Sequence, residues 1–186
     1  MNQQSDLMIR ECAQSAIAAI AAHRDDTPAL GAALHAAMKP LLTRNDLPSL
    51  GIPRIANHLP GSFYLYYDTR MSILLYEVPE GVVVAPHDHG IWETLFVWRG
   101  KFHHTVYARG DDGSVAGRAS LRVLDDRDLA PGDFAIVAPP DDIHGFRAVE
   151  PGSWGITIVD GAYKDARHYY DPAAGTYTIK QQRNAR

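Results

Sequence analysis

One short stretch of the sequence concentrates side chains that can bind a metal ion. Residues 86–93 read PHDHGIWE and contain His87, His89 and Glu93 at odd-numbered positions. Alternate residues of an extended strand point to the same face, so these three side chains are expected to converge on one ion. Imidazole and carboxylate together suit a first-row divalent ion such as Fe, Mn, Ni or Zn. His144, predicted in a turn after a later strand, is expected to complete the set.

The carboxylate of Glu93 has three alternative roles. It can be a ligand of the ion, an acceptor that orients one of the histidines, or a general base. We expect Glu93 to be a ligand, or to move between ligand and base. Its role decides how many coordination positions an octahedral ion keeps for a substrate.

Three further residues are predicted to contact a substrate: Tyr76, Trp92 and His104. His103 and His104 are adjacent, so they face opposite sides of a strand and only one of them can look inward. Aromatic residues on strands often belong to the core, which is the alternative for Tyr76 and Trp92. Four arginines are candidate anchors for an anion: Arg70, Arg99, Arg122 and Arg147. Structural or solvated positions are expected for His23, His35, His58 and His168.

The elements that must position these residues are mostly strands. Short β-branched or aromatic runs occupy residues 63–67, 71–78, 81–85, 92–98, 102–107, 120–124, 134–137 and 153–159. Turn-forming residues separate them at intervals of roughly 8 to 12 residues, a pattern typical of a β-sandwich or small barrel. The expected fold class is therefore all-β, preceded by a helical segment.

That helical segment is predicted over residues 5–44. Apolar side chains recur there at i+4 spacing, and Asp26-Thr27-Pro28 can start a second helix that Pro40 ends or bends. The proline- and glycine-rich residues 48–61 are expected to be an extended connection. We divide the chain into a helical segment with its linker (1–60), a barrel (61–170) and a polar tail (171–186).

Composition excludes several classes of protein. The 186 residues carry a net charge of −4, so no basic surface is expected for nucleic acid. Cys12 is the single cysteine, which excludes an intrachain disulfide framework. Neither a signal sequence nor a membrane-spanning run is apparent, and a soluble cytoplasmic protein is expected.

The histidine stretch resembles the first motif of the cupin superfamily. Gly81, His87, His89, Glu93 and Gly100 match that motif at every position. The second motif is matched more loosely, with His144 in its expected place after Pro139, and Asp141 and Ala148 in place of the usual glycine and asparagine. The resemblance implies a double-stranded β-helix barrel that holds a metal ion through His87, His89, His144 and possibly Glu93.

Within that superfamily the chain looks most like the thiol dioxygenases, which include cysteine dioxygenase and 3-mercaptopropionate dioxygenase. The likeness rests on residues 86–89 and Trp92, on residues 165–168, and on the helical N-terminus. However, Gly155, Thr157 and Val159 stand where those enzymes have serine, histidine and tyrosine. We therefore expect poor turnover of L-cysteine.

The resemblance implies a mononuclear Fe(II) oxygenase that acts on a small organic substrate with O2 as a monomer or homodimer. A second interpretation keeps the site but uses Mn, Ni or Zn for redox-neutral isomerase, lyase or hydrolase chemistry. A third is a cupin that binds a small ligand without turnover.

Overall fold

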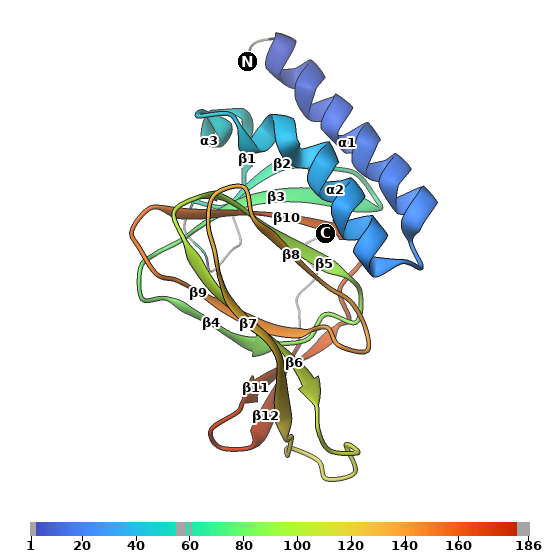
Figure 1. The fold of residues 1–186 in the computed structure, drawn as a ribbon, viewed down its shortest axis with the longest axis vertical. Helices are drawn as coiled ribbons and strands as arrows, with labels where there is room; N and C mark the ends of the chain where they lie inside the picture. Colours follow the sequence, from blue (N-terminus) through green and yellow to red (C-terminus); the bar gives the residue numbers. More distant parts are fainter. Residues whose placement is uncertain (1–2, 55–58, 60, 182–186) are drawn as a thin grey trace.

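Two antiparallel sheets form the body of the protein in the computed structural model, which describes residues 3–54, 59 and 61–181. Sheet A has the order β1 (Ile52–Pro53), β2 (Phe63–Tyr67), β3 (Met71–Val78), β10 (Ser153–Asp160), β5 (Glu93–Arg99) and β8 (Phe134–Val137). Sheet B has the order β12 (Thr176–Gln181), β11 (Ala166–Asp171), β4 (Val83–His87), β9 (Ile143–Ala148), β6 (Phe102–Arg109) and β7 (Leu121–Leu129). The sheets face each other as a jelly-roll barrel (Figure 1), so the predicted cupin-type fold class is confirmed.

Two long helices cover the outer face of sheet A (Figure 1). Helix α1 spans Gln3–His23 and α2 spans Thr27–Leu42. The Asp26 side chain accepts a hydrogen bond from the backbone N–H of Ala29, which caps α2 as the sequence predicts. Pro40 lies inside α2, so the helix continues past it to Leu42.

The connection predicted over residues 48–61 is not wholly extended. Helix α3 (Leu47–Leu50) forms one turn there, with Pro48 in its first turn where a missing N–H costs nothing. Strand β1 then pairs with β2, so the segment before the barrel adds a short strand to sheet A. The expectation for His58 lies outside the described residues. No described helix combines the length and apolarity needed to cross a bilayer.

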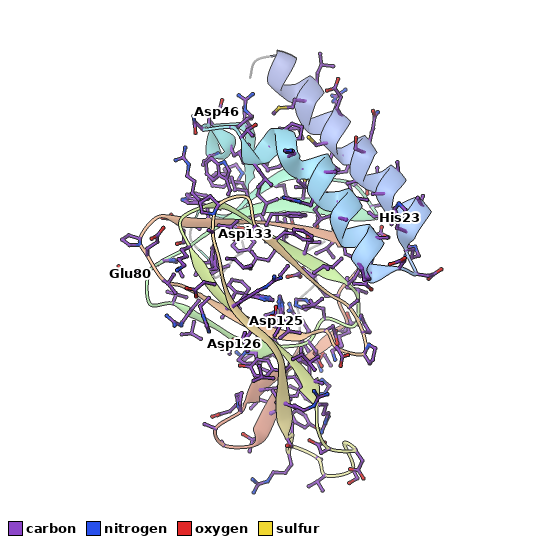
Figure 2. The ribbon with its side chains drawn as sticks, viewed as in Figure 1. His23, Asp46, Glu80, Asp125, Asp126 and Asp133 are labelled. Carbon is purple, nitrogen blue, oxygen red and sulfur yellow. The ribbon has the colours of Figure 1, made fainter. Side chains whose placement is uncertain are left out.

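Apolar residues form a separate core on each face of sheet A. The helix-side core lies between sheet A and the helices and includes Ile9, Cys12, Leu30, Leu34, Met38, Leu41, Ile73, Phe96, Trp98 and Ile158. The inner core lies between the two sheets and includes Leu74, Tyr76, Val78, Leu95, Val97, Phe102, Leu129, Phe146 and Ala148. Strand β5 serves both, because its side chains alternate between the faces. Side chains fill the interior between the two sheets (Figure 2). Asp125 and Asp126, which are labelled in that figure, belong to β7.

Candidate metal centre

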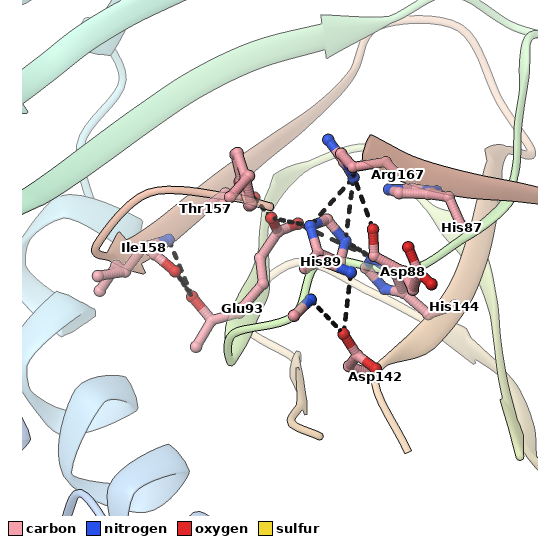
Figure 3. A network of polar contacts seen from close by, with 12 residues as sticks. His87, Asp88, His89, Glu93, Asp142, His144, Thr157, Ile158 and Arg167 are labelled. Atoms are coloured by element: carbon pink, nitrogen blue, oxygen red, sulfur yellow. Dashed lines mark hydrogen bonds and ion pairs between the residues drawn. The ribbon is translucent and has the colours of Figure 1, made fainter. Parts of the chain in front are cut away.

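Three histidines meet inside the barrel beside the inner core. His87 ends β4 and is the register partner of His144 on the neighbouring strand β9. His89 lies two residues further on, in the connection between β4 and β5 (Figure 3). One ring nitrogen of each histidine lies within 4.8 Å of the others, and the three residues are 5%, 1% and 1% exposed. The structure therefore brings together the three histidines that the sequence singles out.

Two local expectations about these residues are wrong. His87, His89 and Glu93 do not share one strand, because β4 stops at His87 and Glu93 begins β5. Their odd-numbered positions along a single strand therefore do not explain why these side chains converge. They converge because the chain turns after β4 and because β4 pairs with β9. His144 lies on strand β9 and not in a turn. Its glycine neighbour Gly145 lets the β4 backbone approach closely, since a Cβ there would lie 3.0 Å from Pro86 N and Val84 O.

The donor atoms fit a divalent metal ion. His89 Nε2 and His144 Nε2 are 2.9 Å apart. Two metal–nitrogen bonds of about 2.0 to 2.1 Å that meet at roughly a right angle give about this separation. Burial, reinforced by the adjacent imidazoles, holds the pKa values of His89 and His144 well below the usual range. Both rings are consequently neutral near pH 7 and offer lone pairs to a cation.

In two of the three histidines, the Nδ1 atom of the ring contacts another group of the protein. His87 Nδ1 donates to the carbonyl oxygen of Ala85 at 2.7 Å, and His144 Nδ1 is 2.9 Å from His104 Nε2. When His144 Nδ1 donates to His104, His144 Nε2 carries a free lone pair that faces His89. His104 is buried, as predicted, but its contact is with a ligand histidine. Its own Nδ1 has no partner among the described residues.

Glu93 lies against the histidine cluster but outside the group of three close nitrogens. Its Oε2 is 3.2 Å from His89 Nδ1, and its Oε1 is 3.8 Å from His144 Nε2. Tyr163 donates its hydroxyl hydrogen to Oε2. Burial raises the pKa of Glu93 to about 7, against the opposing effects of the Tyr163 hydrogen bond and the Arg167 charge. In this arrangement Glu93 is an acceptor beside His89, and its role as a ligand, or as a group that moves between ligand and base, stays a prediction.

Arg167 is a residue of this site that sequence reasoning missed. It comes from β11, is 8% exposed, and donates from Nε to the carbonyl oxygen of Asp88 at 3.0 Å. Its Nη2 lies 3.0 Å from His89 Nδ1, and its guanidinium lies over the ring of Tyr163 at 4.7 Å (Figure 3). The four arginines predicted as anion anchors do not include it. The signal available in the sequence was the strand-like run after Ala166, which the strand prediction omitted.

Two buried carboxylates fix the turn that carries His89. Asp142 Oδ2 accepts the backbone N–H groups of His89 and Gly90 at 2.9 and 2.6 Å. Gly90 has φ = 74°, a conformation that glycine adopts without strain. Asp88 accepts from the backbone N–H of His168 at 2.9 Å and from the hydroxyl of Tyr170 at 3.1 Å, which ties the turn to β11.

The two aromatic residues predicted to contact a substrate lie in different places. Tyr76 faces inward, and its hydroxyl is 3.0 Å from Thr157 Oγ1. Its ring occupies the space beside Gly155, where a Cβ would lie 3.1 Å from the ring and 2.9 Å from Leu95. Trp92 belongs to the helix-side core, so the structure does not bring it together with the histidines.

Two surface pockets lie elsewhere. One, of about 360 Å³, is lined by residues near Asp111 and Pro172, and the other, of about 280 Å³, lies beside His35 and Arg127. Neither is lined by a residue of the histidine cluster, which side chains enclose.

Comparison with solved structures finds several proteins of low similarity. A cupin superfamily protein from Desulfitobacterium hafniense is 21% identical over 64% of this chain and 92% of its own, with a TM-score of 0.43. An RmlC-like cupin from Shewanella frigidimarina is 22% identical over 54% and 75%, with a TM-score of 0.41. KdgF from Halomonas sp. is 24% identical over 55% and 82%, with a TM-score of 0.40. No family model and no curated protein matches the sequence. The assignment as a cupin-type barrel rests on this chain's own strand order and register.

Proposed function

We propose that this protein is a mononuclear metal enzyme, and that it is an Fe(II) dioxygenase that oxidises a small organic acid, with a thiol as the preferred class. The observation that carries the proposal is the set of three buried imidazoles, each with a ring nitrogen within 4.8 Å of the others. Iron held by His87, His89 and His144 supplies Lewis acidity, electrons for O2 and free coordination positions. Glu93, held at His89, leaves those positions to the substrate and O2.

The charged groups around the histidines support an anionic substrate. Arg167 is buried beside His89, and its planar guanidinium offers several N–H donors there. A substrate carboxylate that enters the cluster gains a charge-assisted hydrogen bond from this group. Arg167 therefore orients the acid, whereas the enclosing side chains exclude water.

Glu93 is suited to move a proton. A carboxyl with a pKa of about 7 is populated in both forms near neutral pH. Its Oε1, which faces His144 Nε2 at 3.8 Å, is the oxygen that takes a proton from a substrate thiol or hydroxyl. The other oxygen, Oε2, accepts the hydrogen bond from Tyr163.

An oxygen-electrode measurement on the iron-loaded protein tests this function. We expect O2 consumption with small thiols that carry a carboxylate, and little with L-cysteine. Iron-dependent consumption is expected to fall when Arg167→Met removes the cation, mainly through a raised KM. The proposal fails if iron-loaded protein consumes no O2 with a panel of small thiol and hydroxy acids.

The Glu93 carboxyl group also favours one alternative function. A buried Glu93 paired with Tyr163 can shuttle a proton between two carbons or onto a leaving group, which suits redox-neutral chemistry with Mn, Ni or Zn. Product formation from sugar or keto acids without O2 consumption, on Mn- or Zn-loaded protein, would favour this function. The proposed partners are limited to the small substrate and, for the oxygenase, O2.

A further inference from the structure

Tyr163 joins the candidate metal centre from a segment that no sequence motif marks. It lies in residues 161–165, which connect β10 to β11. Its hydroxyl donates to Glu93 Oε2, its ring packs on His89 with centroids 5.0 Å apart, and the Arg167 guanidinium covers the ring.

The connecting segment is fastened to the turn that carries His89. The backbone N–H of Lys164 donates to the carbonyl oxygen of His89 at 3.2 Å. Lys164 Nζ forms an ion pair with Asp88 Oδ2 at 2.5 Å. Tyr163 is thus held in place by the residue that follows it, and its own hydroxyl is directed at Glu93.

The structure shows Glu93 in one position, in which Oε2 accepts from Tyr163 and lies 3.2 Å from His89 Nδ1. Oε1 lies 3.8 Å from His144 Nε2, and Glu93 is outside the group of three close nitrogens. To ligate an ion held by the three histidines, the carboxylate would have to move toward them. The Tyr163 hydrogen bond to Oε2 opposes that movement.

We propose that Tyr163 is a positioning residue that keeps Glu93 off the metal ion, and so determines whether the ion has three or four protein ligands. The inference rests on the proposed three-histidine metal site. The hydroxyl group of Tyr163, which lies outside the histidine motif, determines whether Glu93 is a hydrogen-bond acceptor or a metal ligand. When that hydroxyl group is removed, Glu93 is expected to ligate the ion.

Cobalt(II) titration of metal-free protein tests the proposal without any turnover. Visible absorption of cobalt(II) weakens as its coordination number rises, so it reports an added ligand. In Tyr163→Phe we expect weaker absorption per cobalt and roughly tenfold tighter binding, the size of effect that groups around metal ligands commonly have. In Tyr163→Phe/Glu93→Gln both changes are expected to disappear.

Two further variants complete the experiment. Tyr170→Phe removes a phenol that donates to Asp88 and not to Glu93, so its cobalt spectrum is expected to match the wild type. Glu93→Gln alone is also expected to keep the wild-type spectrum, because Glu93 is not a ligand while Tyr163 holds it. This variant tests the proposal even if Tyr163→Phe does not fold.

The outcomes separate this proposal from the proposed function. An unchanged spectrum in Tyr163→Phe, a change that persists in the double variant, or a spectrum altered by Glu93→Gln alone overturns the role of Tyr163 and leaves the metal site standing. Failure of the wild-type protein to bind cobalt overturns the metal site, and the proposal with it.

Discussion

Each ligand histidine has one ring nitrogen committed to the protein and one directed at its neighbours. Ala85 O and His104 Nε2 bind the Nδ1 atoms of His87 and His144. Glu93 and Arg167 both approach Nδ1 of His89. Because an arginine can only donate and a carboxylate only accept, the two select opposite tautomers of His89. A cation on Nε2 favours the tautomer that donates to Glu93.

The ligand assignment leads to a first prediction. His87→Ala and His144→Ala are expected to abolish tight metal binding, because each removes one of three nitrogens and leaves a cavity. His103→Ala is the control, since His103 contacts Asp126 and Asp128 outside the barrel. Metal content after dialysis measures the effect. A near-stoichiometric metal content in both ligand variants would exclude this site.

A second prediction concerns His104, which touches no ion. His104→Leu removes the acceptor for His144 Nδ1, so the ring loses its fixed tautomer and orientation. Metal affinity is expected to fall about 10- to 100-fold. The adjacent His103→Leu is expected to leave it unchanged, and competition with a chelator measures both. Equal affinities for the two variants would show that His104 is only a packing residue.

At the scale of elements, the site is built where strands end. The turn between β4 and β5 carries His89, and two side chains tie it to distant segments of the chain. Asp142 binds its backbone from just before β9, and Asp88 reaches across to β11. The turn is therefore fixed before any ion binds, which reduces the ordering that binding requires.

Removing the second anchor gives a prediction for the turn. Asp88→Ala leaves the backbone N–H of His168 and the hydroxyl of Tyr170 without their acceptor in a buried position. The free energy of unfolding of metal-free protein is expected to fall by about 3 kcal/mol. Asp112→Ala, in an exposed loop, is expected to cost little. Urea unfolding compares them, and equal midpoints would contradict the anchoring role.

The same elements show which parts of the fold and of the site could be predicted from the sequence. Most strands and the turn residues between them were predictable, because alternation and turn chemistry are local. The meeting of His87, His89 and His144 was predictable from their spacing together with the cupin resemblance, although the single-strand reason given for it was wrong. Tyr163 and Arg167 were not, since they lie 70 and 78 residues from their partners Glu93 and His89. The pairing of strands brings these two residues to the site, and a single sequence does not show which strands pair or in which register.

At the scale of the whole molecule, sheet A lies between the helices and the histidine cluster. Along β5, Glu93 and Leu95 face inward, whereas Phe96 and Trp98 pack under the helices. The N-terminal segment predicted as an appendage therefore covers an apolar face that water would otherwise reach. Its contribution is to stability, and the inner face holds the chemistry.

This division predicts a variant that loses stability but keeps its site. Met38 is fully buried in the helix-side core, and Met38→Ala is expected to lower the free energy of unfolding by about 3 kcal/mol. Cobalt affinity of the folded protein is expected to be unchanged. Leu7→Ala, at a 53% exposed position of α1, is the control. A loss of cobalt affinity in folded Met38→Ala protein would contradict the separation.

The chain's single cysteine provides a reporter of motion in this outer layer. Cys12 lies on α1 in the helix-side core, is 2% exposed, and burial raises the pKa of its thiol. A thiol reagent can reach it only when α1 moves away from α2 or when the whole chain unfolds. When reclosing is faster than labelling, the ratio of the observed labelling rate to that of an unstructured thiol gives the free energy of the opening that exposes Cys12. A value below the free energy of global unfolding would show that α1 detaches by itself, with no engineered probe.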